Sequence, residues 1–210
     1  MAPGFYDAEA GGDNSLPHRR RRLIFTQYLD FSSPEAAMGK TALIVADMLN
    51  DFIDPDGSLY VGPSGREIIP FVARKIETTR RQGGVVIFVC DAHAPDDREF
   101  KFFAPHAVKG SWGSQVIPEL PVQPGDYRLD KTRYTAFYNT DLEEVLRQEQ
   151  VERVEVVGVC TSICVMETVK ELFDRDIPAL VYRDGVADFD PEAHAFALKH
   201  MARIFGAQVV

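Results

Sequence analysis

The stretch that decides the fold is "VEVVGVCTSICVMETV", which runs from Val154 to Val169. Its first half is a continuous apolar run, as expected of a strand that is buried on both faces of a parallel sheet. A short polar turn follows, and a helical pattern begins near Ser162. Two of the chain's three cysteines, Cys160 and Cys164, stand at this turn. The stretch therefore predicts a buried strand that leads through a cysteine-bearing turn into a helix.

The same alternation of strand and helix patterns extends along the chain in both directions. Strand patterns occupy 41–47, 85–91, 126–131, 151–159, 178–184 and 207–210. Helical patterns occupy 67–82, 141–150, the segment from Ser162 onward and 191–206. This order predicts a three-layer α/β/α sandwich with a mostly parallel, doubly wound six-stranded sheet.

Composition limits the classes of protein to which the chain can belong. It has 210 residues, 45% of them hydrophobic, which is enough for one sizeable core. Its net charge of −9 argues against a basic nucleic-acid-binding surface, and no apolar run reaches the ~18 residues of a membrane span. No signal peptide is recognised, and three cysteines do not make a disulfide framework. We therefore expect a cytoplasmic protein with no nucleic-acid partner and no membrane partner.

Residues 1–40 differ in composition from the rest of the chain. They are rich in Gly, Ala, Asp, Ser and Pro, and they contain a basic run, "HRRRR", at 18–22. We expect an N-terminal extension over 1–40, either a solvated tail or an arm that contacts another subunit of an oligomer. One α/β domain is expected over 41–210.

Polar residues stand where the predicted strands end. Asp47 ends the first strand, Asp91 the second and Lys131 the third, and the fourth leads into Cys160 and Cys164. An Asp at a strand end is most often only a cap of a turn or helix. Ligands of open α/β sheets, however, bind at the carboxyl ends of the strands. Taken together, these side chains predict a functional site at this edge of the sheet.

Cys164 is the better nucleophile of the two cysteines. It falls in the first turn of the predicted helix, where free N–H groups and the macrodipole favour a thiolate, and Lys131 would lower its pKa further. Asp47 would take the thiol proton and pass it to a leaving group. Cys160 would offer its backbone N–H to an oxyanion, while its side chain, like that of Cys90, fits a small buried hydrophobe.

A second cluster lies in the loop "DAHAPDDREFKFFAPH", which begins at Asp91. Asp91 and His93 alternate so as to point the same way from an extended segment, and Glu99 and His106 would fold back onto them. Two imidazoles and two carboxylates suit one divalent metal ion, Zn, Mn or Fe. Asp97 is an alternative to Glu99, and a solvated acidic loop is the alternative to a metal site.

These segments resemble the isochorismatase-like cysteine hydrolases, and among them most the metal-dependent nicotinamidases. The resemblance covers about residues 41–210 and is carried by "ALIVADMLNDF", "DAHAPDDREF…FFAPH", "LDKTRYTAFYNTDLE", "VVGVCTSICVMETV" and "DPEAHAFALKHM". It implies a catalytic triad of Asp47, Lys131 and Cys164. It also implies an oxyanion hole made by the backbone N–H groups of Cys160 and Cys164.

The resemblance assigns further residues of the same site. The implied metal ligands are Asp91, His93, Glu99 and His106. The implied lining of an aromatic-ring pocket is Phe52, Phe103 and Tyr134. A cis peptide bond between Val159 and Cys160 is implied as well. One departure is Ser162, where the family usually has Asp; Ser can still cap a helix, but the missing charge bears on local polarity and substrate preference.

The implied function is hydrolysis of nicotinamide to nicotinate and ammonia through a cysteine thioester, a reaction of NAD salvage, by a cytoplasmic homo-oligomer. Two alternatives stay open: another hydrolase of this scaffold acting on a ureido or carbamoyl amide or on isochorismate, and a non-catalytic binding or scaffold protein. The joint presence of Asp47, Lys131 and Cys164 argues against the second alternative. A dinucleotide-binding oxidoreductase is excluded, because no glycine fingerprint follows the first strand.

Overall fold

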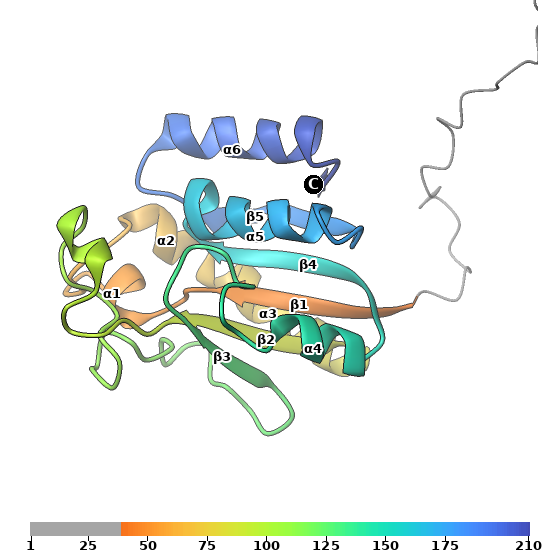
Figure 1. Ribbon diagram of the computed structural model, residues 1–210, viewed down its shortest axis with the longest axis horizontal. Coiled ribbons are helices and arrows are strands. Elements are labelled where there is room, and N and C mark those ends of the chain that lie inside the picture. Colours follow the sequence, from red (N-terminus) through yellow and green to blue (C-terminus); the bar gives the residue numbers. More distant parts are fainter. Residues whose placement is uncertain (1–38) are drawn as a thin grey trace, which may run out of the picture. The chain divides into compact units, whose positions relative to one another are not determined.

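Six parallel strands form one sheet in the computed structural model, which describes residues 39–210 (Figure 1). The strands are β1 (Lys40–Ala46), β2 (Val85–Asp91), β3 (Tyr127–Lys131), β4 (Val151–Val159), β5 (Ala179–Ala187) and β6 (Gln208–Val209). Their order is β3-β2-β1-β4-β5-β6, and every neighbouring pair is parallel. The chain builds outward from β1 to one edge and then to the other, so the sheet is doubly wound. The predicted sandwich is confirmed, with an all-parallel sheet.

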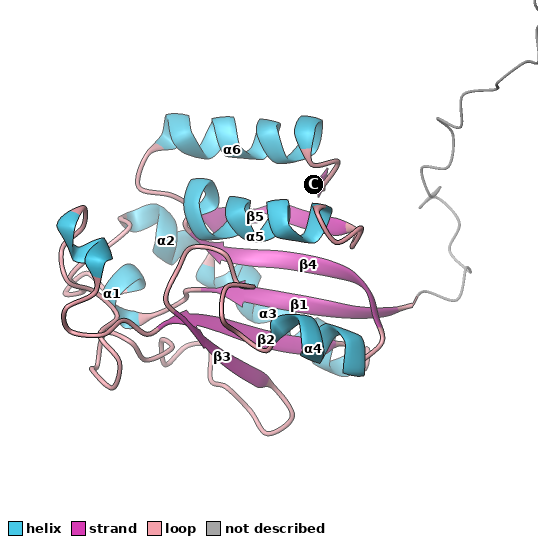
Figure 2. Cartoon of the chain, viewed as in Figure 1, coloured by secondary structure: helices cyan, strands magenta, loops and turns pink. Residues whose placement is uncertain are grey.

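Helices connect most of the strands (Figure 2). They are α1 (Asn50–Ile53), α2 (Pro63–Glu67), α3 (Ile69–Arg81), α4 (Leu142–Gln148), α5 (Met166–Phe173) and α6 (Pro191–Ile204). Four short elements were not expected: the helices α1 and α2, a 3-10 turn, η1 (Arg98–Lys101), and a five-residue π-helical turn, η2 (Thr161–Val165). The last of these stands where the sequence predicts the regular start of a helix.

Helices cover both faces of the sheet, and successive residues of a strand face opposite layers (Figure 1). Ile44 of β1 belongs to a core cluster with Leu142 of α4 and Met201 of α6. Its neighbour Leu43 belongs to a second cluster with Val72 of α3. Both strand residues are fully buried. Burial on two faces is the reason why the strand sequences are continuously apolar rather than alternating.

Strand β5 is longer than the sequence pattern indicates. The pattern ends the strand at 184, where a polar run is followed by Gly185, but the strand continues to Ala187. Val181 pairs with Val156, whereas Val186 pairs with Gly158, so residues 182–185 form a bulge opposite β4. The extension brings the chain to the carboxyl edge of the sheet before it turns into α6.

Strand β4 approaches β1 closely at Gly158. This residue has φ of 116°, and any side chain there would collide with the backbone carbonyl of Ala46. Only glycine therefore fits. The contact places the end of β4, and with it Cys160, beside the end of β1, where Asp47 follows.

The sequence analysis also made predictions about membrane spans and about residues 1–40. None of the helices found in residues 39–210 is long and apolar enough to cross a membrane. The tail or arm expected over 1–40 falls almost entirely on residues 1–38, which lie outside the described part of the chain.

Candidate active site

The polar residues predicted at the strand ends do meet at one edge of the sheet. Asp47 follows β1, Asp91 ends β2, Lys131 ends β3 and Cys164 lies in η2 directly after β4. Asp47 has φ of 51°, a left-handed conformation that is uncommon outside glycine and recurs at functional sites. Its backbone N–H donates to the carbonyl of Val89 at 2.9 Å, which fixes this turn against β2.

Lys131 is the centre of a buried charge cluster. Its Nζ lies 2.9 Å from Asp47 Oδ2, 2.5 Å from Asp91 Oδ1 and 3.5 Å from Cys164 Sγ. The lysine side chain is 1% exposed. The three residues expected to form a triad are therefore in mutual reach. Asp91, which the sequence assigned only to the metal loop, also pairs with the lysine.

Burial dominates the acid–base properties of this cluster. It raises the pKa of Asp47 to about 6, with the charge of Asp91 adding to the effect and Lys131 opposing it. Burial alone would lower the pKa of Lys131, but the charges of Asp47 and Asp91 hold it well above its ordinary value. Lys131 is therefore a fixed positive charge, and Asp47 is poised to exchange a proton near neutral pH.

The pKa of Cys164 differs from the sequence-based prediction. Burial raises the pKa of the Cys164 thiol well above its usual range, and the nearby Lys131 charge only opposes this effect. Lys131 acts on the Cys164 pKa in the expected direction, but the net lowering that the sequence suggests was wrong, because the sequence does not reveal complete burial. The resting thiol is protonated, so it needs a base, and Asp47 is the carboxylate beside it.

The turn that carries Cys164 is held in an unusual geometry. The peptide bond between Val159 and Cys160 is cis, as the family resemblance implies. The Cys160 carbonyl accepts hydrogen bonds from the N–H groups of Ile163 and Val165, both at 3.1 Å. Cys160 and Cys164 are both buried and neither forms a disulfide. The use of their backbone N–H groups as an oxyanion hole stays a prediction.

Ser162 is the second residue of η2, whose N-cap is Cys160, so it does not stand at the capping position that the sequence suggests. Its backbone N–H instead donates to Oδ2 of Asp188 at 2.6 Å, across 26 residues of sequence. Asp188 is buried and lies directly after β5. Sequence reasoning missed this residue, because the polar run before it was taken as the end of the strand.

Three of the four predicted metal ligands come together. Ligand atoms of Asp91, His93 and His106 all lie within 4.8 Å of one another. Ligands bound at about 2.0–2.2 Å from a zinc ion stand roughly 3–4 Å apart, so this group has the right size. His93 is fully buried, and neither of its ring nitrogens makes an aligned hydrogen bond in the described chain, although Nδ1 lies 3.3 Å from Asp97 Oδ2 and Nε2 lies 3.6 Å from Asp91 Oδ2. Buried imidazole nitrogens without an aligned hydrogen bond fit a bound ion, since such nitrogens are otherwise costly.

The geometry separates the roles of Glu99 and Asp97. Glu99 Oε1 lies 3.7 Å from His106 Nε2, on the ligand side. Asp97 Oδ2 lies 3.3 Å from His93 Nδ1, and Asp97 also pairs with Arg133 at 3.2 Å. This is the position of a carboxylate that orients a ligating histidine from behind. The arrangement therefore favours Glu99 over Asp97 as the fourth ligand.

The candidate nucleophile and three of the four candidate ligands, Asp91, Glu99 and His106, line one small pocket. The aromatic residues expected at a ring-binding site, Phe52, Phe103 and Tyr134, all line it. The Phe52 and His106 rings are 5.3 Å apart, so the aromatic wall touches the ligand set. The remaining lining is Asp47, Leu59, Asp91, Glu99, His106, Val159, Cys160, Ile163, Cys164 and Phe189. Among these, Leu59, Ile163 and Phe189 carried no signal in the sequence beyond being apolar.

Known proteins share both the sequence and this architecture. The sequence model of the isochorismatase domain matches residues 41–210. An isochorismatase family protein of Bacillus subtilis, PncA, is 37% identical over 180 residues, which cover 81% of this chain and 98% of that protein. A probable inactive nicotinamidase of Arabidopsis thaliana is 33% identical over 175 residues, 78% of this chain and 89% of that one.

Solved structures give the same result. The crystal structure of nicotinamidase PncA from Bacillus subtilis superposes with a TM-score of 0.78 at 33% identity, covering 81% of this chain and 99% of that one. N-carbamoylsarcosine amidase from Thermoplasma acidophilum superposes with a TM-score of 0.74 at 37% identity, covering 81% and 95%. A zinc complex of pyrazinamidase from Pyrococcus horikoshii gives 0.77 at 29% identity, covering 81% and 98%. By sequence, fold and the hydrolases it resembles, this chain belongs to the isochorismatase family.

Proposed function

We propose that the protein is a nicotinamidase that hydrolyses nicotinamide to nicotinate and ammonia through a thioester on Cys164. One observation carries the proposal: Asp91 belongs to two groups at once. Its carboxylate lies with His93 and His106 in the candidate ligand set, and with Asp47 and Cys164 in the candidate catalytic cluster. A substrate held at the first group would therefore present its amide to the second.

The pocket supports a neutral aromatic amide as the substrate. Its walls carry Phe52, Phe103 and Tyr134, which suit a flat ring. No lysine or arginine is among the described residues that line it. A ureido acid would bring a carboxylate into this pocket without a cation to balance it, which is unfavourable in a buried site.

Asp47 and Cys164 supply the acid–base and nucleophilic chemistry. Asp47 takes the proton of the buried Cys164 thiol as the sulfur attacks the amide carbon, and Lys131 stabilises the developing thiolate from 3.5 Å. Ammonia then leaves with a proton from Asp47. With a pKa of about 6, Asp47 suits both directions of this transfer near neutral pH.

Backbone groups and water complete the cycle. The tetrahedral oxyanion is stabilised by the N–H groups of Cys160 and Cys164, which stand at the start and near the end of the turn. Asp47 then activates the water that cleaves the thioester, and nicotinate is released. Ammonia and nicotinate are the only products, and the enzyme returns to its starting protonation state.

A divalent ion fits the donor set. Asp91, His93, Glu99 and His106 would hold it, and its chemistry when bound is to anchor the ring nitrogen and polarise ligands at the open positions. Zinc, manganese and iron all suit two imidazoles and two carboxylates.

Ammonia release from purified, metal-replete protein tests the proposal. We expect fast turnover of nicotinamide and pyrazinamide, and slow turnover of benzamide, which has the ring and the amide but no ring nitrogen. Cys164→Ala should abolish release. Chelation should abolish it reversibly, with recovery when the ion is returned.

Two results would contradict the proposal. Turnover of a ureido or carbamoyl compound without turnover of nicotinamide would assign a different substrate to the same cluster. A complete lack of Cys164-dependent turnover would favour the non-catalytic alternative. In the cell, we expect the enzyme to act in cytoplasmic NAD salvage as a homo-oligomer, and light scattering coupled to gel filtration measures its subunit number.

A further inference from the structure

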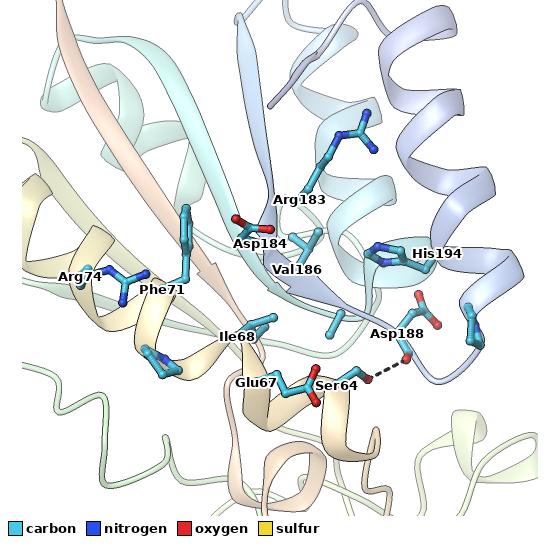
Figure 3. A pocket seen from close by; sticks show the side chains of 13 residues that line it. Ser64, Glu67, Ile68, Phe71, Arg74, Arg183, Asp184, Val186, Asp188 and His194 are labelled. Carbon is cyan, nitrogen blue, oxygen red and sulfur yellow. Dashed lines mark hydrogen bonds between the residues drawn. The ribbon is translucent and has the colours of Figure 1, made fainter.

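A groove separates α2 and α3 from β5 and the start of α6, outside the pocket just described (Figure 3). Its volume is about 460 Å³. Its outer walls carry exposed charges of both signs, Arg74, Arg183 and Asp184 among them. Asp188 and His194 also line it (Figure 3). These two side chains reach through to the back of the turn that carries the candidate nucleophile.

Asp188 makes the first of two contacts with that turn. Its Oδ2 accepts a hydrogen bond from the backbone N–H of Ser162 at 2.6 Å. Asp188 is 8% exposed, and it forms no ion pair with any cation in residues 39–210. A buried carboxylate without a cation is costly unless N–H groups compensate it. The short bond to Ser162 is therefore its principal stabilising contact.

His194 makes the second contact. Its Nδ1 lies 2.9 Å from the hydroxyl of Thr161, a residue that is fully buried. The backbone N–H of His194 donates to the carbonyl of Asp190 in the first turn of α6. Two successive residues of the turn, Thr161 and Ser162, are thus tied to one external segment, 188–194.

We propose that Asp188 is a positioning residue for the nucleophilic turn. By holding the Ser162 N–H, it fixes the first turn of η2, and so the Cys160 peptide and the Cys164 thiol at its two ends. This role rests on the proposed function, because it concerns the geometry of attack by Cys164.

The charge of Asp188 has a second consequence for the same turn. Burial raises the pKa of the Cys160 thiol well above its ordinary value, and Asp188 is the charge that adds most to this effect. The pKa of the Cys164 thiol is raised as well, and what favours Cys164 as the nucleophile is the Lys131 ammonium 3.5 Å from its sulfur. The chemistry is left to Cys164, four residues away.

A carboxylate exchange between positions 162 and 188 tests the role. In Asp188→Ser the turn loses its acceptor, and we expect kcat for ammonia release to fall about 10- to 100-fold with KM within about twofold, as for a misplaced nucleophile. Asp188→Asn keeps an acceptor but loses the charge, and its kcat should lie between those of wild type and Asp188→Ser. The reason is that a charge-assisted hydrogen bond is about twice as strong as a neutral one. The double variant Ser162→Asp/Asp188→Ser returns a carboxylate to the turn and should recover kcat to within about threefold of wild type.

Cys164 alkylation by iodoacetamide gives a readout that does not depend on the amide substrate. Its rate, followed by peptide mass spectrometry, should fall about tenfold in Asp188→Ser and recover in the double variant. Asp184→Ser is the matched control, since it removes an exposed carboxylate from the same groove, and should change neither kcat nor alkylation. Thermal unfolding of each variant identifies any that fails to fold.

The proposal would be overturned if Asp188→Ser kept kcat and alkylation within twofold of wild type. It would equally be overturned if a folded double variant were no better than Asp188→Ser. If Asp188→Ser or the double variant does not fold, the alkylation rates of Asp188→Asn and wild type decide the question, equal rates counting against it. A wild-type protein that releases no ammonia from nicotinamide would refute the proposed substrate, while the alkylation rates would still decide the role of Asp188.

Discussion

Two lysines of the described chain lie in charged clusters, one buried and one half-buried, and the two clusters are built on different principles. Lys131 lies at the carboxyl edge of the sheet, 1% exposed, against Asp47 and Asp91. Lys75 of α3 lies over the sheet face, with its side chain 19% exposed, 2.6 Å from Glu155 and 2.8 Å from the hydroxyl of Tyr182. Both lysines are paired with acidic partners. The two clusters differ in whether their buried polar atoms all have hydrogen-bond partners.

The Lys75 cluster is closed. The Tyr182 hydroxyl donates to Glu155 Oε2 at 3.0 Å, and Arg153 approaches Oε1 of the same carboxylate at 3.5 Å. No buried polar atom of this cluster lacks a hydrogen-bond partner. Burial would lower the pKa of Lys75, but Glu155 and Tyr182 reverse the effect and raise it. Such a network stabilises the packing of α3 and has nothing left to offer a ligand.

The Lys131 cluster is open. The buried side-chain atoms without a hydrogen bond in residues 39–210 are Asp47 Oδ2, which touches Lys131 Nζ without hydrogen-bond alignment, and both ring nitrogens of His93. All of them belong to this cluster or to the ligand set beside it. Unsatisfied buried atoms are costly, so their concentration at one place marks the site as one built to bind. The comparison teaches that buried charge alone does not indicate function; unfilled hydrogen-bonding capacity does.

Of the substitutions considered, removal of the candidate nucleophile should have the largest effect on activity and only a small effect on stability. We expect Cys164→Ala to lower the rate of ammonia release about 10,000-fold or more, because Cys164 is the thiol that Lys131 contacts at 3.5 Å. The free energy of unfolding should change by only about 1–2 kcal/mol, the cost of one small buried side chain. Both are measured on the same preparation, by ammonia assay and denaturant titration.

Cys90→Ala is the control for this variant. Cys90 is buried in β2 and does not line the pocket. It should cost similar stability and leave the rate unchanged. Equal loss of activity in the two variants would show that the thiol acts through packing rather than chemistry.

Removing Lys131 should damage both properties. In Lys131→Met the carboxylates of Asp47 and Asp91 are left buried without their cation, which we expect to cost about 3–5 kcal/mol of unfolding free energy. The rate should fall about 100- to 1,000-fold, as when a preorganised electrostatic contact is removed. Denaturant titration and the ammonia assay measure the two effects. A variant with wild-type activity would mean that the lysine only neutralises the site.

A substitution of Asp97 tests whether this residue binds the metal ion itself or only orients the ligand His93. Asp97→Asn weakens the carboxylate behind His93, 3.3 Å from Nδ1, and should reduce metal affinity about 10- to 100-fold. At saturating metal the turnover rate should stay within a few-fold of wild type. Titration with zinc against a competing chelator measures the affinity. Asp96→Asn, the exposed neighbour, should bind metal like the wild type, and a loss of both metal and turnover in Asp97→Asn would make Asp97 a ligand in place of Glu99.

The sequence predicts which residues form the Lys131 cluster better than it predicts their acid–base properties. Apolar runs locate the strands, and the rule that ligands bind at strand ends brings Asp47, Asp91, Lys131 and Cys164 to one edge without any structure. The degree of burial is not written in these residue types, and it decides the sign of the Cys164 pKa shift. Pattern reasoning therefore predicted which residues meet at this edge of the sheet but not their protonation.

Long-range contacts that depend on irregular backbone are the second feature that the sequence does not predict. Asp188 reaches the nucleophilic turn only because a bulge over 182–185 lets β5 run past its polar stretch. Local periodicity cannot show a bulge of this kind, because its residues are those of a typical strand end. For a related reason, the sequence does not show that Asp91 belongs both to the candidate metal ligands and to the Lys131 cluster. One carboxylate has two oxygens, and the sequence does not say which neighbour each oxygen contacts.

Breaking the closed cluster should have the smallest effect. Lys75→Met removes two contacts, but Glu155 keeps the hydroxyl of Tyr182 and the guanidinium of Arg153, and the methionine stem still covers the Tyr182 ring. We expect unfolding free energy to fall by about 1–2 kcal/mol and ammonia release to stay within twofold, measured by the same two assays as for Lys131→Met. Met stands in for Lys in both variants, so the pair differs only in which cluster is broken. A tenfold loss of activity in Lys75→Met would mean that the α3 face communicates with the site, and the distinction between a closed structural cluster and an open functional one would fail.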